Sequence, residues 1–433
     1  MHKFCMPLVC AAFSASVSFA QGADRVPQAD VPQTAPSSAV LATRAVPLSL
    51  AQAVDTALRL SPQLRAVGLE LEATEGLIMQ AGALPNPTLG FQQEDTRPGT
   101  RVTTFELSQP IELGGKRAAR IELAERSRAV AAAEVDARLA DVRAATIQAF
   151  FESLVAQERV ALARESLRVA SSALGAASRR VTAGKVAPTE ETRAGVAQAT
   201  ARIELSQAEA ERAASLHALT ALMGVPDDAV MALDGRPDVL PQLPDNAVLA
   251  DGLARSPTLR RAQSEAERLG AAYELERTRR IPDVTVSLGM RRAQELGRSQ
   301  PVIGVSIPIP IFNANQGAQL EALRRRDAAQ AQAQAEGLRL RAEVLQAASQ
   351  LRARRTEIEA LQREVLPGAV SAFEAAARGF ELGKFSFLDV LDAQRTLLQS
   401  RAQYLRALSE AHRASADLNR RLALPIAVSG TNP

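Results

Sequence analysis

Leu107 to Arg120 reads LSQPIELGGKRAAR, and the hydrophobic period of the chain changes within this stretch. Phe105 and Leu107 alternate with polar neighbours, which is typical of a β-strand. Pro110 has no backbone N–H and is expected to end the ladder of strand hydrogen bonds. The Gly-Gly pair that begins at Gly114 permits an open turn, and Lys116 starts a long Ala-rich run with helical spacing. The stretch therefore predicts a junction at which a β-sheet gives way to a long helical rod.

The same change of pattern occurs once more, between residues 303 and 316. Apolar residues alternate from Ile303 to Ile309, Pro308 and Pro310 break the strand, and a second helical run follows. Each junction comes directly after a candidate β-hairpin, in residues 88–108 and 283–310. The chain is thus predicted to contain two short hairpins, each of which leads into a very long helix.

The two helical runs are too long for an ordinary globular helix. No proline occurs between residues 115 and 182, so a single helix there would be about 100 Å long at 1.5 Å per residue. Such a rod must pack lengthwise against similar rods. In the second run Leu366-Pro367-Gly368 predicts a kink, because proline removes one helical hydrogen bond and clashes with the preceding turn.

Landmarks of the first half recur in the second half at a nearly constant offset. Ser256-Pro257 follows Ser61-Pro62 by 195 positions, and Gly383-Lys384 follows Gly184-Lys185 by 199. Constant offsets over several landmarks indicate a tandem duplication. The predicted organisation is a signal peptide (1–20), an extended arm (21–47), a first repeat (48–224, tip near 183–190), a linker (225–246), a second repeat (247–424, tip near 382–389) and a tail (425–433).

The composition excludes several classes of protein. Only 3% of the residues are aromatic and there is no tryptophan, which disfavours one large globular core. Lysine and arginine number 51 against 48 acidic residues, and these charges are dispersed, so no nucleic-acid partner is expected. The chain has no Ser/His/Asp arrangement, phosphate-binding loop or His/Cys cluster. We therefore expect no enzyme, no cofactor and no metal site.

Both cysteines, Cys5 and Cys10, lie near the start of an apolar segment that ends in Ser18-Phe19-Ala20. The segment has the pattern of a secretory signal peptide, and it is shorter than the roughly 20 residues of a membrane-spanning helix. Lipidation of Cys10 is the alternative, although the bulky Val9 precedes it. After cleavage at Ala20 the mature chain would contain no cysteine.

Four predicted strands in one chain cannot form a closed sheet in a membrane, because both sheet edges would expose unpaired backbone groups to lipid. Two copies would supply eight strands and three copies would supply twelve, and outer-membrane barrels permit both numbers. The alternative is a soluble hairpin on a helical protein, which periodicity alone does not exclude. A membrane location therefore requires an oligomer.

The junction sequence QPIELGGKR resembles the strand-to-helix junction of the TolC-like outer-membrane factors, and the resemblance covers nearly the whole chain from about Leu48. It implies a mainly α fold with a small membrane β-barrel: a homotrimer whose twelve-stranded barrel continues into a twelve-helix tunnel across the periplasm. It also implies outer-membrane lipid, a periplasmic adaptor and an inner-membrane RND pump as partners. QPIELGGKR is most similar to the branch that works with heavy-metal efflux pumps.

Three acidic residues near the two helical tips are candidate gate residues. Asp389 and Asp392 stand three apart on one helix face, and in a symmetric oligomer each would become a ring of negative charge that attracts cations. Their segment FLDVLDA is similar to the acidic aperture segment of the family, and Glu190 resembles its other acidic gate residue. The alternative is that all three stabilise helix N-termini, at ~0.3–1 kcal/mol each.

Each tip also carries a Gly-Lys pair, and in the family these tips dock the adaptor. The resemblance implies that role for Gly184, Lys185, Gly383 and Lys384. The alternative is that the two lysines are solvated loop residues, since exposed ion pairs contribute only ~0.2–1 kcal/mol.

The function implied is a passive exit duct of a tripartite efflux system, with cobalt, zinc, cadmium or nickel ions as cargo. A duct for drugs or for a type I secretion system is the first alternative. A periplasmic coiled-coil adaptor is the second, although an adaptor would have a β-rich lipoyl-like section and a single long hairpin.

Overall fold

The computed structural model describes residues 47–422 except 228–229, 231 and 383. The chain divides into residues 1–44 and 45–433, and the description below concerns the second unit. The predicted signal peptide with Cys10, nearly all of the predicted arm, and the predicted tail lie outside the described residues.

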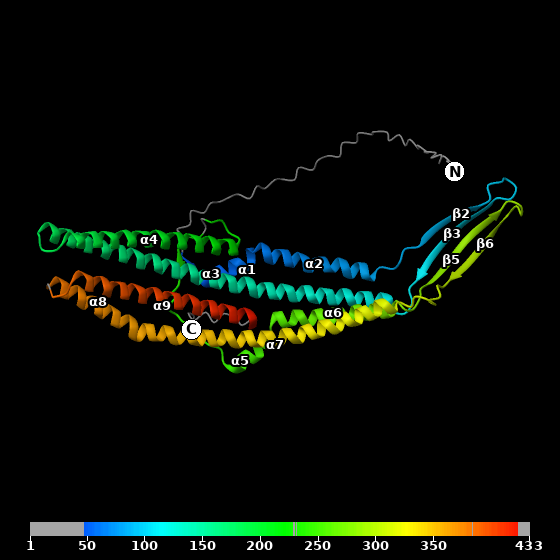
Figure 1. Cartoon of the computed structure of the whole chain (residues 1–433). Helices are drawn as coiled ribbons and strands as arrows, with labels where there is room; N and C mark the ends of the chain where they lie inside the picture. The colour runs from blue at the N-terminus through cyan, green and yellow to red at the C-terminus, as the bar shows by residue number, and fades with distance from the viewer. Residues whose placement is uncertain (1–46, 228–229, 231, 383, 423–433) are drawn as a thin grey trace, which may run out of the picture. The chain divides into compact units, whose positions relative to one another are not determined.

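The elements of the first half are two short helices, a hairpin and two long helices (Figure 1). They are β1 (Leu48–Ser49), α1 (Leu50–Leu60), α2 (Pro62–Gly82), β2 (Thr88–Glu94), β3 (Val102–Ile111), α3 (Lys116–Thr182) and α4 (Pro188–Met223). The second half repeats this order after β4 (Leu233–Asp234), with a π-helical turn η1 in its long helix. Its elements are α5 (Asn246–Ala254), α6 (Pro257–Thr278), β5 (Val284–Ala293), β6 (Arg298–Ser306), α7 (Gln316–Ala360), η1 (Leu361–Val365), α8 (Leu366–Glu381) and α9 (Phe387–Leu422).

The first predicted rod is one uninterrupted helix, α3, of 67 residues. The α-helical pattern of the second rod changes where the Leu366-Pro367-Gly368 motif predicts a kink. There the π-helical turn η1 ends at Val365, and Pro367 stands in the first turn of α8. A π turn widens the helix by one residue, and such turns occur where proline removes a hydrogen bond from a continuous helix.

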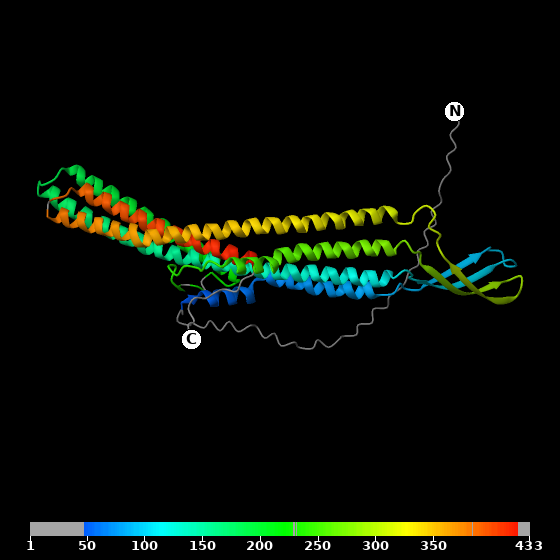
Figure 2. The ribbon, with the colours of Figure 1, turned by 90° about the horizontal axis from the view of Figure 1, so that it is seen from below.

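The two hairpins form one antiparallel sheet in the order β2-β3-β5-β6. The central pairing is between β3 and β5, which belong to different halves of the chain, and it runs from Val102 opposite Ala293 to Ile111 opposite Val284. The sheet lies at one end of the long helices, and the α3–α4 and α8–α9 turns lie at the other end (Figures 1 and 2).

Two details of the predicted hairpins are wrong. Pro110 does not end the ladder, because β3 continues to Ile111 and Pro110 stands opposite Thr285. The pairing of β2 with β3 stops at Thr88 and Ser108, so β3 has a partner on one side only at Pro110, and a residue without an N–H is tolerated on such an edge. The second hairpin ends at Ser306 rather than near residue 310, ahead of Pro308.

The helices form a layer whose order changes along its length. Near the sheet α2 packs against α3, α3 against α6, and α6 against α7. Toward the far end α4 packs against α3, α3 against α9, and α9 against α7 and α8. No helix within the described part of the chain combines the length and the apolar character that a membrane crossing requires.

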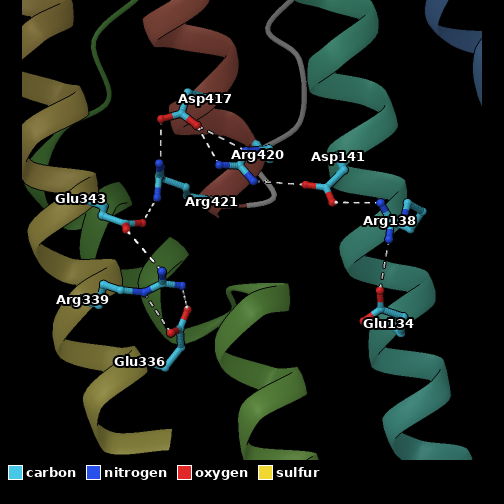
Figure 3. A network of polar contacts seen from close by, with 9 residues as sticks. All are labelled: Glu134, Arg138, Asp141, Glu336, Arg339, Glu343, Asp417, Arg420 and Arg421. Atoms are coloured by element: carbon cyan, nitrogen blue, oxygen red, sulfur yellow. Dashed lines mark hydrogen bonds and ion pairs between the residues drawn. The ribbon is translucent and has the colours of Figure 1, made fainter. Parts of the chain in front are cut away.

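An ion-pair network joins three long helices near the end of α9 (Figure 3). Asp417 accepts from both Arg420 and Arg421 at 2.9 Å. Arg420 also reaches Asp141 on α3 at 3.2 Å, while Arg421 pairs with Glu343 on α7. Burial lowers the pKa of Arg421, and the neighbouring Arg339 adds to this effect. The network fixes α9 between α3 and α7.

Candidate functional site at the helical tips

The first tip turn ends α3 with a left-handed residue. Gly184 has φ +70°, its N–H donates to the Val181 carbonyl at 2.9 Å, and the Lys185 N–H donates to the Arg180 carbonyl at 2.9 Å. These two bonds are the Schellman pattern of helix termination, which favours glycine at the left-handed position. The glycine that the sequence singles out is therefore required by the backbone conformation of the turn.

At the second tip turn α8 ends with a backbone hydrogen bond that spans the same number of residues. The Lys384 N–H donates to the Gly379 carbonyl at 2.8 Å, which corresponds to the bond from Lys185 to Arg180. A Cβ at Gly379 would overlap the ring of Phe385, so that ring covers the end of α8. Gly383 lies outside the described residues. The side chains of Lys185 and Lys384 are exposed, and no ion pair within the described chain involves either of them.

Asp389 caps the helix that follows the second tip. Its carboxylate accepts from the backbone N–H and from the hydroxyl of Ser386, both at 2.8 Å, and the Asp389 N–H donates to the Ser386 hydroxyl at 3.3 Å. This reciprocal arrangement is a capping box. The hydrogen bonds from Ser386, led by that of its hydroxyl, hold the pKa of Asp389 below its ordinary value. The Ser-x-x-Asp spacing of Ser386 and Asp389 is the signal in the sequence that indicates this cap.

The other two acids differ from Asp389 in their surroundings. Asp392 lies one turn further along α9 with an exposed side chain, and Glu190 is half-buried in the first turn of α4. No side-chain hydrogen bond or ion pair within the described residues involves either carboxylate. In the single chain these two carboxylates are therefore available for interactions with other groups, whereas Asp389 already has Ser386 as its partner.

A clasp that sequence reasoning missed joins the two tips. The guanidinium of Arg180 on α3 lies 4.1 Å from the ring centroid of Phe380 on α8, and it donates to the Phe380 carbonyl at 3.4 Å. Phe380 and Leu391 pack against the buried Ala177 and Ala194 of the first tip. The two contact partners are 200 positions apart, so only the repeat offset could have placed them together.

At the opposite end of the helices, the GGKR motif ties the two halves of the chain together. Lys116 pairs with Asp283 at 2.6 Å, and the Leu113 N–H donates to the same carboxylate at 3.1 Å. Gly114 has φ +73°, and a Cβ there would lie 2.8 Å from the Cβ of Ile281. The junction of the first repeat thus packs directly on the segment of the second repeat that connects α6 to β5.

The described residues contain no group of three or more His, Cys, Asp or Glu side chains that could hold a metal ion. The site is instead a pair of helix-to-helix turns with acidic first turns and a clasp between them.

The sequence pattern of the outer membrane efflux protein family matches residues 53–225 and 248–423. The chain belongs to this family. The two matched segments cover most of the chain, so this outer membrane efflux protein is an outer-membrane protein of a transport family and not of an enzyme class. It also does not belong to the class of periplasmic adaptors.

Two curated relatives of this efflux protein come from Cupriavidus metallidurans. The chain is similar to the cobalt-zinc-cadmium resistance protein CzcC, with 45% identity over 86% of this chain and 90% of the relative. It is also similar to the nickel and cobalt resistance protein CnrC, with 33% identity over 66% of this chain and 69% of the relative.

Among solved structures, the fold is similar to that of CusC, which was studied for its transmembrane channel formation. The TM-score is 0.74 at 19% identity, over 86% of this chain and 91% of that chain. At this level of identity the likeness shows the fold alone. The mainly helical fold is therefore that of the TolC-like outer-membrane channels.

Proposed function

We propose that this protein is the outer-membrane duct of a tripartite RND-type efflux system that exports divalent heavy-metal cations, with cobalt, zinc, cadmium and nickel as candidate cargo. The observation that supports this choice of cargo is the 45% identity to a cobalt-zinc-cadmium resistance protein over 90% of that protein's length.

The sheet supports a place in the membrane because its two faces differ in chemistry. Residues directly opposite each other share a face, and one cross-strand row consists of Leu89, Leu107, Leu288 and Ile303. The next row on that face holds Phe91, Phe105 and Met290, and both rows are exposed. The other face carries Gln92, Thr104, Arg291 and Gln300 in one row. An apolar outer face and a polar inner face are expected of an outer-membrane barrel.

The two edges of the sheet support assembly with further copies. Within the described chain β2 pairs only with β3, and β6 pairs only with β5. Unpaired backbone groups in lipid each cost several kcal/mol, so we propose that β6 of one copy pairs with β2 of the next. Three copies would close a twelve-stranded barrel, as the resemblance to the family implies.

The helix layer has free edges on the same two sides as the sheet. On α4 the residues Thr192, Val196, Ala199 and Ile203 are spaced four, three and four apart, and all are exposed. They lie opposite Ala194 and Ala201, which are buried. On α7 the exposed residues Ala331, Ala335, Leu338, Ala342 and Leu345 have the same spacing. This is the seam pattern of a coiled coil, and we propose that these stripes pack between copies in a twelve-helix tunnel.

We place the gate and the adaptor contact at the helical tips. Asp392 and Glu190 would each form a ring of negative charge around the tunnel end, and Asp389 would add its charge while it caps α9. Gly184, Lys185, Gly383 and Lys384 would present the two turns to the adaptor. The clasp between Arg180 and Phe380 would hold the two turns of one copy together.

The test of the proposed function is growth of a strain that lacks only this protein. Graded zinc, cobalt, cadmium and nickel are compared with a panel of hydrophobic drugs, and the wild-type gene supplied in trans is the control. Sensitivity to the cations alone, reversed by the gene, is the expected result. Sensitivity to the drugs alone would support an efflux duct but would show that its cargo is drugs and not metal cations. Unchanged growth in all four metals would contradict the metal assignment.

A further inference from the structure

The segment between the two repeats lies across the long helices as a strap, which we define as residues 232–243. At its start β4 pairs with β1, and the Leu48 N–H donates to the Ala232 carbonyl at 3.0 Å. A Cβ at Gly235 would lie 3.3 Å from Leu154 and 3.4 Å from Phe150, both on α3. Further along, Arg355 on α7 donates to the Pro241 carbonyl at 2.8 Å.

Only one side chain of α9 forms a hydrogen bond to the strap within the described residues, and that side chain is a histidine. The Nε2 atom of His412 lies 2.8 Å from the Pro237 carbonyl oxygen. The imidazole stacks on the Phe151 ring of α3 with a centroid distance of 3.5 Å and an interplanar angle of 9°. It is 4% exposed. His412 therefore sits where the strap, α3 and α9 meet.

Three acidic residues on α3, the strap and α9 are already paired with arginines and so do not neutralise a proton on His412. Glu152 on α3 pairs with Arg413 on α9 at 2.7 Å, and Arg236 on the strap pairs with Asp238 at 2.8 Å. Glu410 on α9 pairs with Arg354 of α7 at 2.8 Å. These three acids thus each already have a basic partner, and a buried unpaired charge is strongly unfavourable.

We propose that His412 is an acid-sensitive latch that releases the strap from α9 and α3 when it takes up a proton. The neutral ring fills the space between Phe151 and Pro237. When the strap opens, water can reach the imidazole and solvate the imidazolium. Because the strap contacts α3, α7 and α9, its release removes one restraint on the relative positions of these three helices.

The sign of the effect follows from burial. Burial lowers the pKa of His412, and the hydrogen bond to Pro237 offsets only part of this. The closed state therefore binds the proton less well than the open state, whose pKa is about 6.5. The latch is fully closed above that pH and weakens as the pH falls through it. At about pH 5 the opening equilibrium can rise by at most roughly 30-fold over its value at neutral pH.

The test is hydrogen exchange of the full-length protein in detergent, followed in peptides that cover the strap. Wild type and His412→Gln are compared at the same pH, near pH 7.5 and near pH 5, so that intrinsic exchange rates cancel. Glutamine keeps a hydrogen-bond donor and does not titrate. The expected result is a several-fold loss of strap protection in wild type at the lower pH relative to the variant.

Two outcomes would overturn the latch. One is equal acid sensitivity of the strap in wild type and His412→Gln. The other is a loss of protection in wild type that is no greater in the strap than in peptides from α2, and this comparison needs no variant. Phe151→Leu is the second variant: it removes the stacked ring and keeps the histidine, so strap protection should fall at both pH values while the acid sensitivity remains.

Discussion

Gly114 offers a sharp test of the junction between sheet and helices. Gly114→Ala forces an L-residue into φ +73° and places a Cβ 2.8 Å from the Cβ of Ile281. The left-handed conformation costs about 1–2 kcal/mol, and an overpacked contact costs typically 1–3 kcal/mol more. The atom in the way lies at the base of the isoleucine side chain and cannot move without the backbone. We therefore expect a loss of about 2–5 kcal/mol in the free energy of unfolding.

Gly115 is the matched control, because it has φ +77° and nothing within 4 Å of a Cβ. Gly115→Ala should cost only the conformational part, about 1–2 kcal/mol. Adding Ile281→Gly to Gly114→Ala should recover the steric part relative to Ile281→Gly alone, because only glycine removes the opposing Cβ. The assay is denaturant unfolding in detergent, followed by far-ultraviolet circular dichroism. Equal losses for Gly114→Ala and Gly115→Ala would refute the close packing of Gly114 against Ile281.

Three further predictions concern the tips. Asp392→Asn should lower the cation preference of the channel in planar-bilayer recordings without changing stability. Unchanged selectivity would show that Asp392 is not a gate residue and serves only as a charge near the helix N-terminus. Asp389→Asn should lower both selectivity and stability, whereas Ser386→Ala should lower stability alone, because it removes only the capping box. Since the pKa of Asp389 is depressed, the box is present above the ordinary aspartate pKa of about 3.9 and is lost as the pH falls through the lower folded value. The stability difference between wild type and Ser386→Ala should therefore shrink near pH 3, and a constant difference would contradict the box. Arg180→Ala should cost ~0.5–1 kcal/mol through the lost cation–π contact, and denaturant unfolding should show a smaller effect for the exposed neighbour Arg179→Ala.

The elements that depend on local pattern could be predicted from the sequence. The absence of proline between residues 115 and 182 predicted the single helix α3, and the Leu366-Pro367-Gly368 motif, which predicted a kink, marks the place where the structure has a π turn. The glycine before Lys185 predicted the turn of the first tip. In each case a few neighbouring residues decide the backbone conformation, so no distant contact is needed.

The features that depend on distant contacts were not predicted. The strand pairing of β3 with β5 requires residues 173 to 191 positions apart to meet, and hydrophobic alternation does not say which strands are neighbours. Pro110 was expected to end its strand, because the early end of β2 is not visible from β3 alone. The contact of His412 with the strap was not predicted either, since the strap has no periodicity that would place it against α9.

The central claim is that a single chain is incomplete and that copies must close its sheet and its helix layer. Native mass spectrometry of the full-length protein, expressed in cells with an outer membrane and purified in mild detergent, tests it directly. We expect a single species with three times the mass of the mature chain, which persists until the detergent is exchanged for a denaturing one. A stable monomer that remains soluble without detergent would contradict it.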